Sequence, residues 1–283
     1  GLLLSLPFLN YDYYLAAWIG FVPLLFAIHS QTLIQSYLYG LLAGLASCAS
    51  ASYWLSEFIV LAQQYRGGPA LLLAFVFWLY SAQIFGLATL IACWLQKRSK
   101  IGLLVIFPCA VISVFSSYPM LFDYRLGDTQ LKFKEVLQAI EYTGVYGIDL
   151  VILLFNVLVY QLISLVIKSI KEPLHNSSMK NKARKQSFLS ALIASTFIAV
   201  WCLYGVFSYT NWQESLPDWH QVTVGIVQPN ETPSLGVHHV EQGYTRAFPP
   251  EMSLTERLVQ QGAKLVIWPE AKSKGYFTFP HVQ

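Results

Sequence analysis

The hydrophobic positions of the chain form long runs separated by short polar segments. Six runs approach or exceed the ~20 apolar residues of a membrane helix, which must satisfy its own backbone because lipid cannot. They are Tyr11–Ile28, Ser36–Leu61, Pro69–Leu95, Ile101–Tyr118, Tyr146–Ile167 and Ser187–Tyr209. We interpret Gly1–Leu6 as the end of a further span closed by Pro7; a secretory signal is the alternative, but neither a basic segment nor a cleavage site supports it. The pattern predicts a transmembrane domain over residues 1–209.

The composition supports this interpretation. Hydrophobic residues make up 55% of the chain and charged residues 12%, and the mean hydropathy is +0.48. Soluble chains carry about 25% charged residues, so a soluble domain, a disordered chain, collagen, a coiled coil and a disulfide scaffold are all excluded. Because the sequence starts at Gly1 and stops at Gln283 directly after a strand-like segment, we expect it to be truncated at both ends.

The distribution of Lys and Arg predicts the orientation. The segments 96–100 and 168–186 hold nine basic residues, whereas the alternating segments 62–68 and 119–145 hold four. Cytoplasmic loops carry the excess of positive charge, so everything after Tyr209 is expected outside the cytoplasm, in the periplasm of a Gram-negative cell. The basic run Lys180–Lys185 fits this rule, and we expect no nucleic-acid partner.

Neither the cysteines nor the histidines suggest a cofactor. Cys48, Cys93, Cys109 and Cys202 all lie in apolar runs, where a cysteine behaves as a small buried hydrophobe. The adjacent His238-His239 has no accompanying ligand cluster. We therefore expect neither a metal nor a cofactor.

The character of the chain changes after Thr210. Residues 210–220 are polar and aromatic and suit an interfacial linker, whereas 221–283 read as the start of an α/β domain. Val222–Val227 and Lys264–Trp268 are predicted as buried parallel strands, and between them Ser253–Gln261 has the capping-box pattern of a helix. In a βαβ unit of this kind, functional residues gather at the carboxyl ends of the strands. Glu270 lies at such an end, although by position alone a solvated turn residue is the commoner interpretation.

The order of these segments resembles the bacterial apolipoprotein N-acyltransferases, membrane enzymes with an extracytoplasmic nitrilase-like domain. The resemblance rests on sequence motifs in the expected order: residues 17–25 (AWIGFVPLL), 125–130 (RLGDTQ), 143–147 (TGVYG), 224–230 (VGIVQPN) and 265–270 (LVIWPE). It implies a polytopic helical membrane bundle followed by an αββα sandwich, incomplete here, over 221–283. Where the family usually has a Lys-Trp pair, this chain has Gly236-Val237.

The resemblance also implies a reaction. The family moves an acyl chain from a phospholipid to the amine of a diacylglyceryl-cysteine on a lipoprotein, using a Glu–Lys–Cys triad and a thioester. Glu270 would be the general base, while the lysine and cysteine are expected beyond Gln283, so we expect this fragment alone to be inactive. The implied partners are a phospholipid donor, a diacylated apolipoprotein acceptor and membrane lipid, and the location is the inner membrane.

Two further residues are candidates for substrate binding. Trp268 precedes the expected base, and Arg125 lies in the external segment 119–145, where a lipid phosphate is one partner and a salt bridge with Asp123 or Asp128 is the favoured alternative. Within this segment, the apolar residues Leu131, Val136, Leu137 and Ile140 predict a helix lying on the bilayer.

Two other functions stay open. A membrane-anchored nitrilase-type amidase would use the same triad with water as the acceptor. A transporter or scaffold with an inert appendage is the third interpretation, and the absence of paired broken spans with buried charge places it last.

Overall fold

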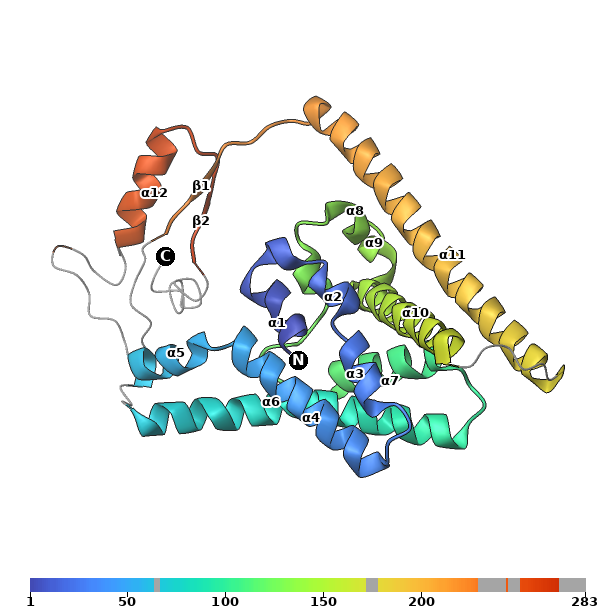
Figure 1. The fold of residues 1–283 in the computed structure, drawn as a ribbon. Helices are drawn as coiled ribbons and strands as arrows, with labels where there is room; N and C mark the ends of the chain where they lie inside the picture. Colours follow the sequence, from blue (N-terminus) through green and yellow to red (C-terminus); the bar gives the residue numbers. More distant parts are fainter. Residues whose placement is uncertain (64–66, 172–177, 229–242, 244–249, 270–283) are drawn as a thin grey trace. The chain divides into compact units, whose positions relative to one another are not determined.

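The computed structural model describes residues 1–63, 67–171, 178–228, 243 and 250–269 (Figure 1). The chain divides into two compact units, which are described separately. One comprises Gly1–Ser56 and Leu71–Glu214, and the other comprises Glu57–Ala70 and Ser215–Gln283.

The membrane unit is built from helices. In chain order they are α1 (Leu2–Leu9), η1 (Tyr11–Tyr13), α2 (Ala16–Ile19), α3 (Val22–Ile28), α4 (Leu33–Ala51), α5 (Trp54–Gln63), α6 (Gly68–Arg98), α7 (Leu103–Ser117), η2 (Gly127–Gln130), α8 (Lys134–Leu137), α9 (Ile140–Thr143), α10 (Val145–Lys171) and α11 (Ser178–Ser215). α5, α6 and α11 extend past the limits of this unit. Their apolar side chains enclose one core, to which α2, α3, α6, α7 and α10 all contribute.

Four helices in the described part of the chain are long and apolar enough to cross a membrane. They are Leu33–Ala51, Gly68–Arg98, Val145–Ile170 and Phe188–Asp218. The predicted helical membrane bundle is therefore confirmed. Two other predicted spans form shorter apolar helices, Ala16–Ile28 and Leu103–Ser117, and the predicted span Ser36–Leu61 is interrupted between α4 and α5. The first helix also differs, because α1 continues through Pro7 and ends at Leu9.

The break between α2 and α3 is compensated by one buried amide. Asn156 of α10 is fully buried, and its Oδ1 accepts a hydrogen bond from the backbone N–H of Phe21 at 2.8 Å. Its Nδ2 donates to the carbonyls of Ala17 and Ile152, each at 2.9 Å. Since an unpaired backbone group in an apolar setting costs several kcal/mol, Asn156 makes this broken segment tolerable inside the bundle.

Small residues bring α4 and α6 close together. A Cβ on Gly40 would lie 2.1 Å from Thr89 Oγ1 and 2.6 Å from the carbonyl oxygen of Phe85. The hydroxyl of Thr89 in turn donates to the carbonyl of Ser36 at 2.8 Å. Such close backbone approach with interhelical hydrogen bonds is typical of membrane helix packing.

In its described residues after Ser215, the second unit contains a small parallel sheet and one α-helix. β1 (Val224–Ile226) pairs with β2 (Leu265–Ile267), Val224 lying opposite Leu265 and Ile226 opposite Ile267. α12 (Pro250–Gln260) connects the described strands and packs on one face, where a Cβ on Gly225 would lie 2.9 Å from Leu258 Cδ1. The predicted parallel βαβ unit is therefore present.

Two details of this unit differ from the prediction. α12 begins at Pro250 rather than at a Ser253 cap, because proline suits the first helical position, and the Ser253 hydroxyl donates to the Pro250 carbonyl within the helix. The strands are also half covered rather than buried: four side chains on one face are 44–71% exposed among the described residues, namely Val224, Ile226, Leu265 and Ile267. The η3 turn (Leu216–Asp218) precedes the unit's first strand.

Candidate functional site

The expected general base, Glu270, lies outside the described residues, but the strand that leads to it is described. The backbone N–H of Val227 donates to the Ile267 carbonyl at 3.0 Å, which extends the parallel pair beyond β1. The carboxyl ends of β1 and β2 therefore lie at the same edge of the sheet. Pro269 has no N–H to donate to a further ladder bond, and the last described bond of the ladder lies at Ile267, three residues before Glu270.

Trp268 is held against α12. Its indole Nε1–H donates to Thr255 Oγ1 at 2.8 Å, and the side chain is half-buried. The only donor of the indole is therefore used within the unit, and any substrate contact of Trp268 would come from its ring. Its role in substrate binding stays a prediction.

Arg125 forms the ion pair that the sequence favoured. Its guanidinium pairs with the carboxylate of Asp123 and lies 5.9 Å from the ring centroid of Tyr146. Its Nε is buried and has no hydrogen-bond partner among the described residues. The neighbouring Asp128 is partly desolvated, and this burial raises the pKa of its carboxyl despite the opposing effect of Arg125.

The loop that carries Arg125 is fastened to the bundle at several points. Tyr124 is buried, and its hydroxyl donates to the Leu4 carbonyl at 3.2 Å and lies 2.8 Å from Ser47 Oγ. Burial raises the pKa of the Tyr124 hydroxyl well above its ordinary value. The loop therefore contacts both α1 and α4 through one neutral side chain.

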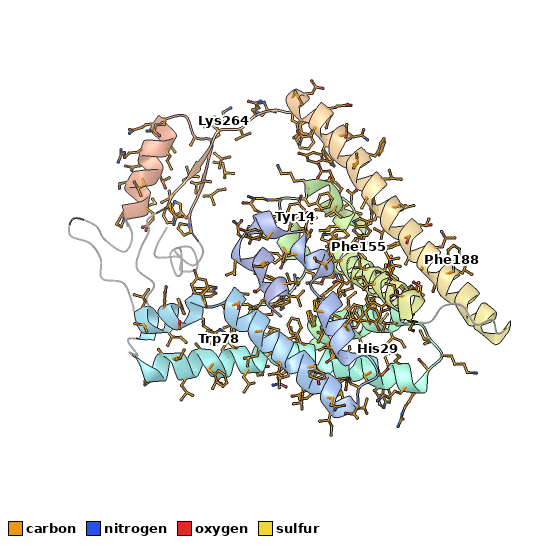
Figure 2. All side chains as sticks on the ribbon, viewed as in Figure 1. Tyr14, His29, Trp78, Phe155, Phe188 and Lys264 are labelled. Atoms are coloured by element: carbon orange, nitrogen blue, oxygen red, sulfur yellow. The ribbon has the colours of Figure 1, made fainter. Side chains whose placement is uncertain are left out.

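Two further polar contacts fix the η2 turn. The Oδ1 of Asp149, a buried residue of α10, accepts a hydrogen bond from the Gly127 N–H at 2.6 Å. The fully buried Gln130 accepts from Trp18 Nε1 at 2.9 Å and donates to the Tyr14 carbonyl at 3.2 Å. Tyr14 lies in the first turns of the chain, near the loop in Figure 2. The motif at 125–130 is thus a structural element that joins α2 to α10.

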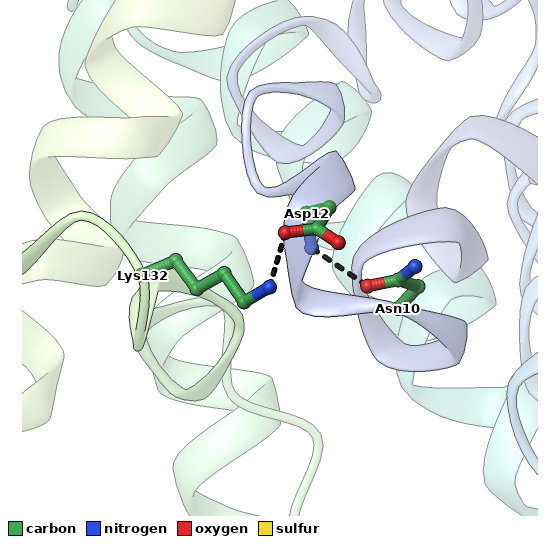
Figure 3. A network of polar contacts seen from close by, with 3 residues as sticks. All are labelled: Asn10, Asp12 and Lys132. Atoms are coloured by element: carbon green, nitrogen blue, oxygen red, sulfur yellow. Dashed lines mark hydrogen bonds and ion pairs between the residues drawn. The ribbon is translucent and has the colours of Figure 1, made fainter.

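A surface contact adds to these (Figure 3). Lys132 pairs with Asp12, and the side chain of Asn10 accepts from the Asp12 N–H at 2.9 Å. The hydrogen bond and charge of Lys132 lower the pKa of the Asp12 carboxyl. The contact joins the η1 turn to the segment after η2.

The expected surface helix at 131–140 differs from the observed structure. The segment forms the two short helices α8 and α9, and Val136 is 1% exposed rather than lipid-facing. The indole Nε1 of Trp201 in α11 donates to the Val136 carbonyl at 2.8 Å. Val136 therefore packs inward against α11, whereas Leu131 remains 53% exposed.

The sequence analysis did not identify two buried polar residues of α10 as anchors. Asp149 holds the η2 turn, and Asn156 holds the break between α2 and α3. A signal was present, since residues seven apart lie on the same helix face two turns away from each other. The part of the chain that the structure describes contains no group of three or more metal-ligating side chains.

Together these features define a class: a helical membrane bundle with an anchored 119–144 loop, continued in sequence by the first βαβ unit of an α/β domain. A family model described as the apolipoprotein N-acyltransferase N-terminal domain matches residues 1–158, and the chain belongs to this family.

A curated relative agrees with this assignment. An apolipoprotein N-acyltransferase of Geobacter metallireducens is 28% identical over 170 residues, which cover 58% of this chain and 32% of the relative. The match thus spans about a third of the relative's length. No solved structure matches the chain.

Proposed function

We propose that the chain provides the membrane part and the first α/β unit of an enzyme that transfers a fatty acyl chain from a phospholipid to the amino-terminal diacylglyceryl-cysteine of lipoproteins. One observation carries the proposal: a family match over residues 1–158 is followed in the same chain by a parallel strand pair whose second strand ends at Ile267, three residues before Glu270. The strand pair alone would not favour this reaction, because parallel strands occur in many enzymes.

In the proposed reaction, Glu270 takes the proton from a cysteine thiol supplied by the full-length protein. The thiolate attacks the phospholipid ester, the bond to the glycerol oxygen breaks, and the lysophospholipid leaves with the proton. A lysine and backbone N–H groups would stabilise the oxyanion, each donor contributing about 2.7–4 kcal/mol. The lipoprotein amine then attacks the thioester, which yields an amide and restores the thiol.

The 119–144 loop has a separate role in this proposal. Arg125 would bind the donor's phosphate by exchanging its bond to Asp123, since guanidinium pairs well with phosphate. The partly exposed ion pair supports this, because an exposed pair contributes little stability and is readily exchanged. The anchors at Tyr124, Gly127 and Gln130 would keep Arg125 in place while the loop borders the lipid.

We further propose that the enzyme lies in the bacterial inner membrane with the α/β domain on the periplasmic side. Contacts between loops support the predicted orientation, in which successive spans cross the membrane in alternating directions. Lys132 pairs with Asp12, which groups the η1 turn with the 119–144 loop. Lys97 donates to the Gln31 carbonyl at 2.7 Å, which groups the α3–α4 turn with the basic 96–100 segment.

The test is acyl transfer by the full-length protein. A diacylated lipoprotein incubated with phospholipid vesicles and enzyme should gain the mass of one fatty acyl chain. Glu270→Gln should abolish the gain, whereas Glu256→Gln, at an exposed position of α12, should preserve it. Release of fatty acid or ammonia without transfer would instead identify an amidase or hydrolase. No change in either substrate would leave a transporter or scaffold.

A further inference from the structure

A small cavity lies at the end of the membrane unit formed by the basic 96–100 segment. It forms where the turn between α3 and α4 meets the last two turns of α6, and it is lined by Ile28, His29, Ser30, Gln31, Cys93, Gln96 and Lys97. His29 marks its position in Figure 2. α7 starts beside this end and leads to the 119–144 loop at its other end, so the cavity and this loop lie at opposite ends of α7.

The lining of the cavity is suited to an anion. It contains a lysine ammonium, an imidazole, two side-chain amides and a hydroxyl, but no carboxylate. The bond from Lys97 to the Gln31 carbonyl fixes the ammonium at the wall and uses one of its three N–H groups. His29 Nδ1 lies 2.6 Å from the hydroxyl of Tyr160, and when that hydroxyl donates, Nε2 carries the hydrogen of the ring.

The surroundings of the cavity are suited to lipid. Large apolar side chains close to it in the chain are exposed on the membrane unit: Ile34 (73%), Trp94 (41%) and Ile101 (56%). The guanidinium of Arg98 lies over the Trp94 ring, 5.1 Å from its centroid. A cation and an indole together are typical of a membrane interface, where the headgroup meets the acyl chains.

We propose that this cavity binds the phosphate of an anionic phospholipid from the cytoplasmic leaflet, as a lipid site distinct from that of the acyl donor. Lys97 contributes the charge, Gln96, Ser30 and His29 contribute hydrogen bonds, and the exposed apolar residues contact the acyl chains. The proposal does not require the acyltransferase activity. It requires only that the basic loops face the leaflet that holds the lipid.

The test measures lipid binding to the purified protein by native mass spectrometry. Phosphatidylglycerol is titrated against wild type, Lys97→Gln, Lys97→Arg and Lys100→Gln, with phosphatidylcholine as the zwitterionic comparison. We expect Lys97→Gln to weaken phosphatidylglycerol binding about fivefold, as for one cation near a bilayer surface, and Lys97→Arg to retain it. Lys100→Gln removes the same charge outside the cavity and should change binding less than twofold.

A second variant and a second ligand complete the experiment. Gln96→Glu leaves Lys97 in place but adds a carboxylate to the lining, and it should weaken phosphatidylglycerol binding more than Lys100→Gln does. Equal effects of Lys97→Gln and Lys100→Gln would overturn the proposal, because they would indicate general surface attraction. Displacement of the lipid by millimolar inorganic phosphate would likewise overturn the lipid assignment, since it would identify a free-anion site.

Discussion

Trp18 and Gln130 lie 112 residues apart in the sequence and are joined by a buried hydrogen bond of 2.9 Å between Nε1 and Oε1. The bond links α2 to the η2 turn, and Gln130 also donates to the Tyr14 carbonyl. One side chain therefore connects the anchored loop to the beginning of the broken helical segment. Because both side chains are buried, removal of either one leaves a polar atom of the other without its hydrogen-bond partner.

This relationship predicts the outcome of a double-mutant cycle. Gln130→Leu should destabilise the membrane unit by about 1–3 kcal/mol, because it leaves the Trp18 N–H buried and unpaired. Trp18→Phe in the same background should cost little more, since the orphaned donor is removed with it. Chemical unfolding in detergent measures the four variants. Strictly additive effects would contradict a direct bond between the two side chains.

Asn156 is expected to be among the most sensitive polar positions of the bundle. Asn156→Leu preserves approximate volume but leaves the Phe21 N–H and the Ala17 carbonyl without their partner. We expect a loss of about 2–6 kcal/mol, twice the range for one buried polar group left unsatisfied. Asn211→Leu, at an exposed position of α11, is the matched control and should change stability by less than about 0.5 kcal/mol. A similar loss in both variants would show that the break does not depend on Asn156.

The sequence predicted the membrane bundle and the βαβ unit well, because both follow from local pattern. Membrane spans and buried strands are both recognised from uninterrupted apolar runs. α6 and α10 are examples of such runs among the spans. Periodicity could not predict the break between α2 and α3, since it is compensated by Asn156, more than 130 residues away. For the same reason the inward packing of Val136 was missed, because it depends on Trp201 of α11. Long-range polar contacts decide these details, and no local pattern encodes them.

The contact between Asp12 and Lys132 predicts a pH effect with a definite sign. Lys132 lowers the pKa of Asp12 from its ordinary value of 3.8, so the folded state binds that proton less readily than the unfolded state. The contribution of this pair to stability is therefore fully present above pH 3.8 and is lost as the pH falls through the lower folded-state value.

The measurement is a carboxyl titration of Asp12 by NMR in detergent micelles. Lys132→Gln should raise the pKa of Asp12 toward its ordinary value, and added salt should do the same in the wild type, because both charges are exposed. Lys134→Gln, two residues further along the same segment, should leave the titration unchanged. An unaltered pKa in Lys132→Gln would mean that the pair does not persist in solution.

The bond between Trp268 and Thr255 predicts how the strand before Glu270 is positioned. Trp268→Phe removes this bond alone, so it should lower kcat of the full-length enzyme about two- to tenfold, the effect of one hydrogen bond, with KM unchanged. Thr255→Val should lower kcat at least as much, because it also removes the bond from the Thr255 hydroxyl to the Glu251 carbonyl. The double variant should be no worse than Thr255→Val, because the bond that Trp268→Phe removes is already absent there. Thr210→Val, whose hydroxyl bonds to Val206 within α11, serves as the control. If Trp268→Phe raised KM while Thr255→Val had no effect, the indole would contact the substrate directly, and the positioning role would be wrong.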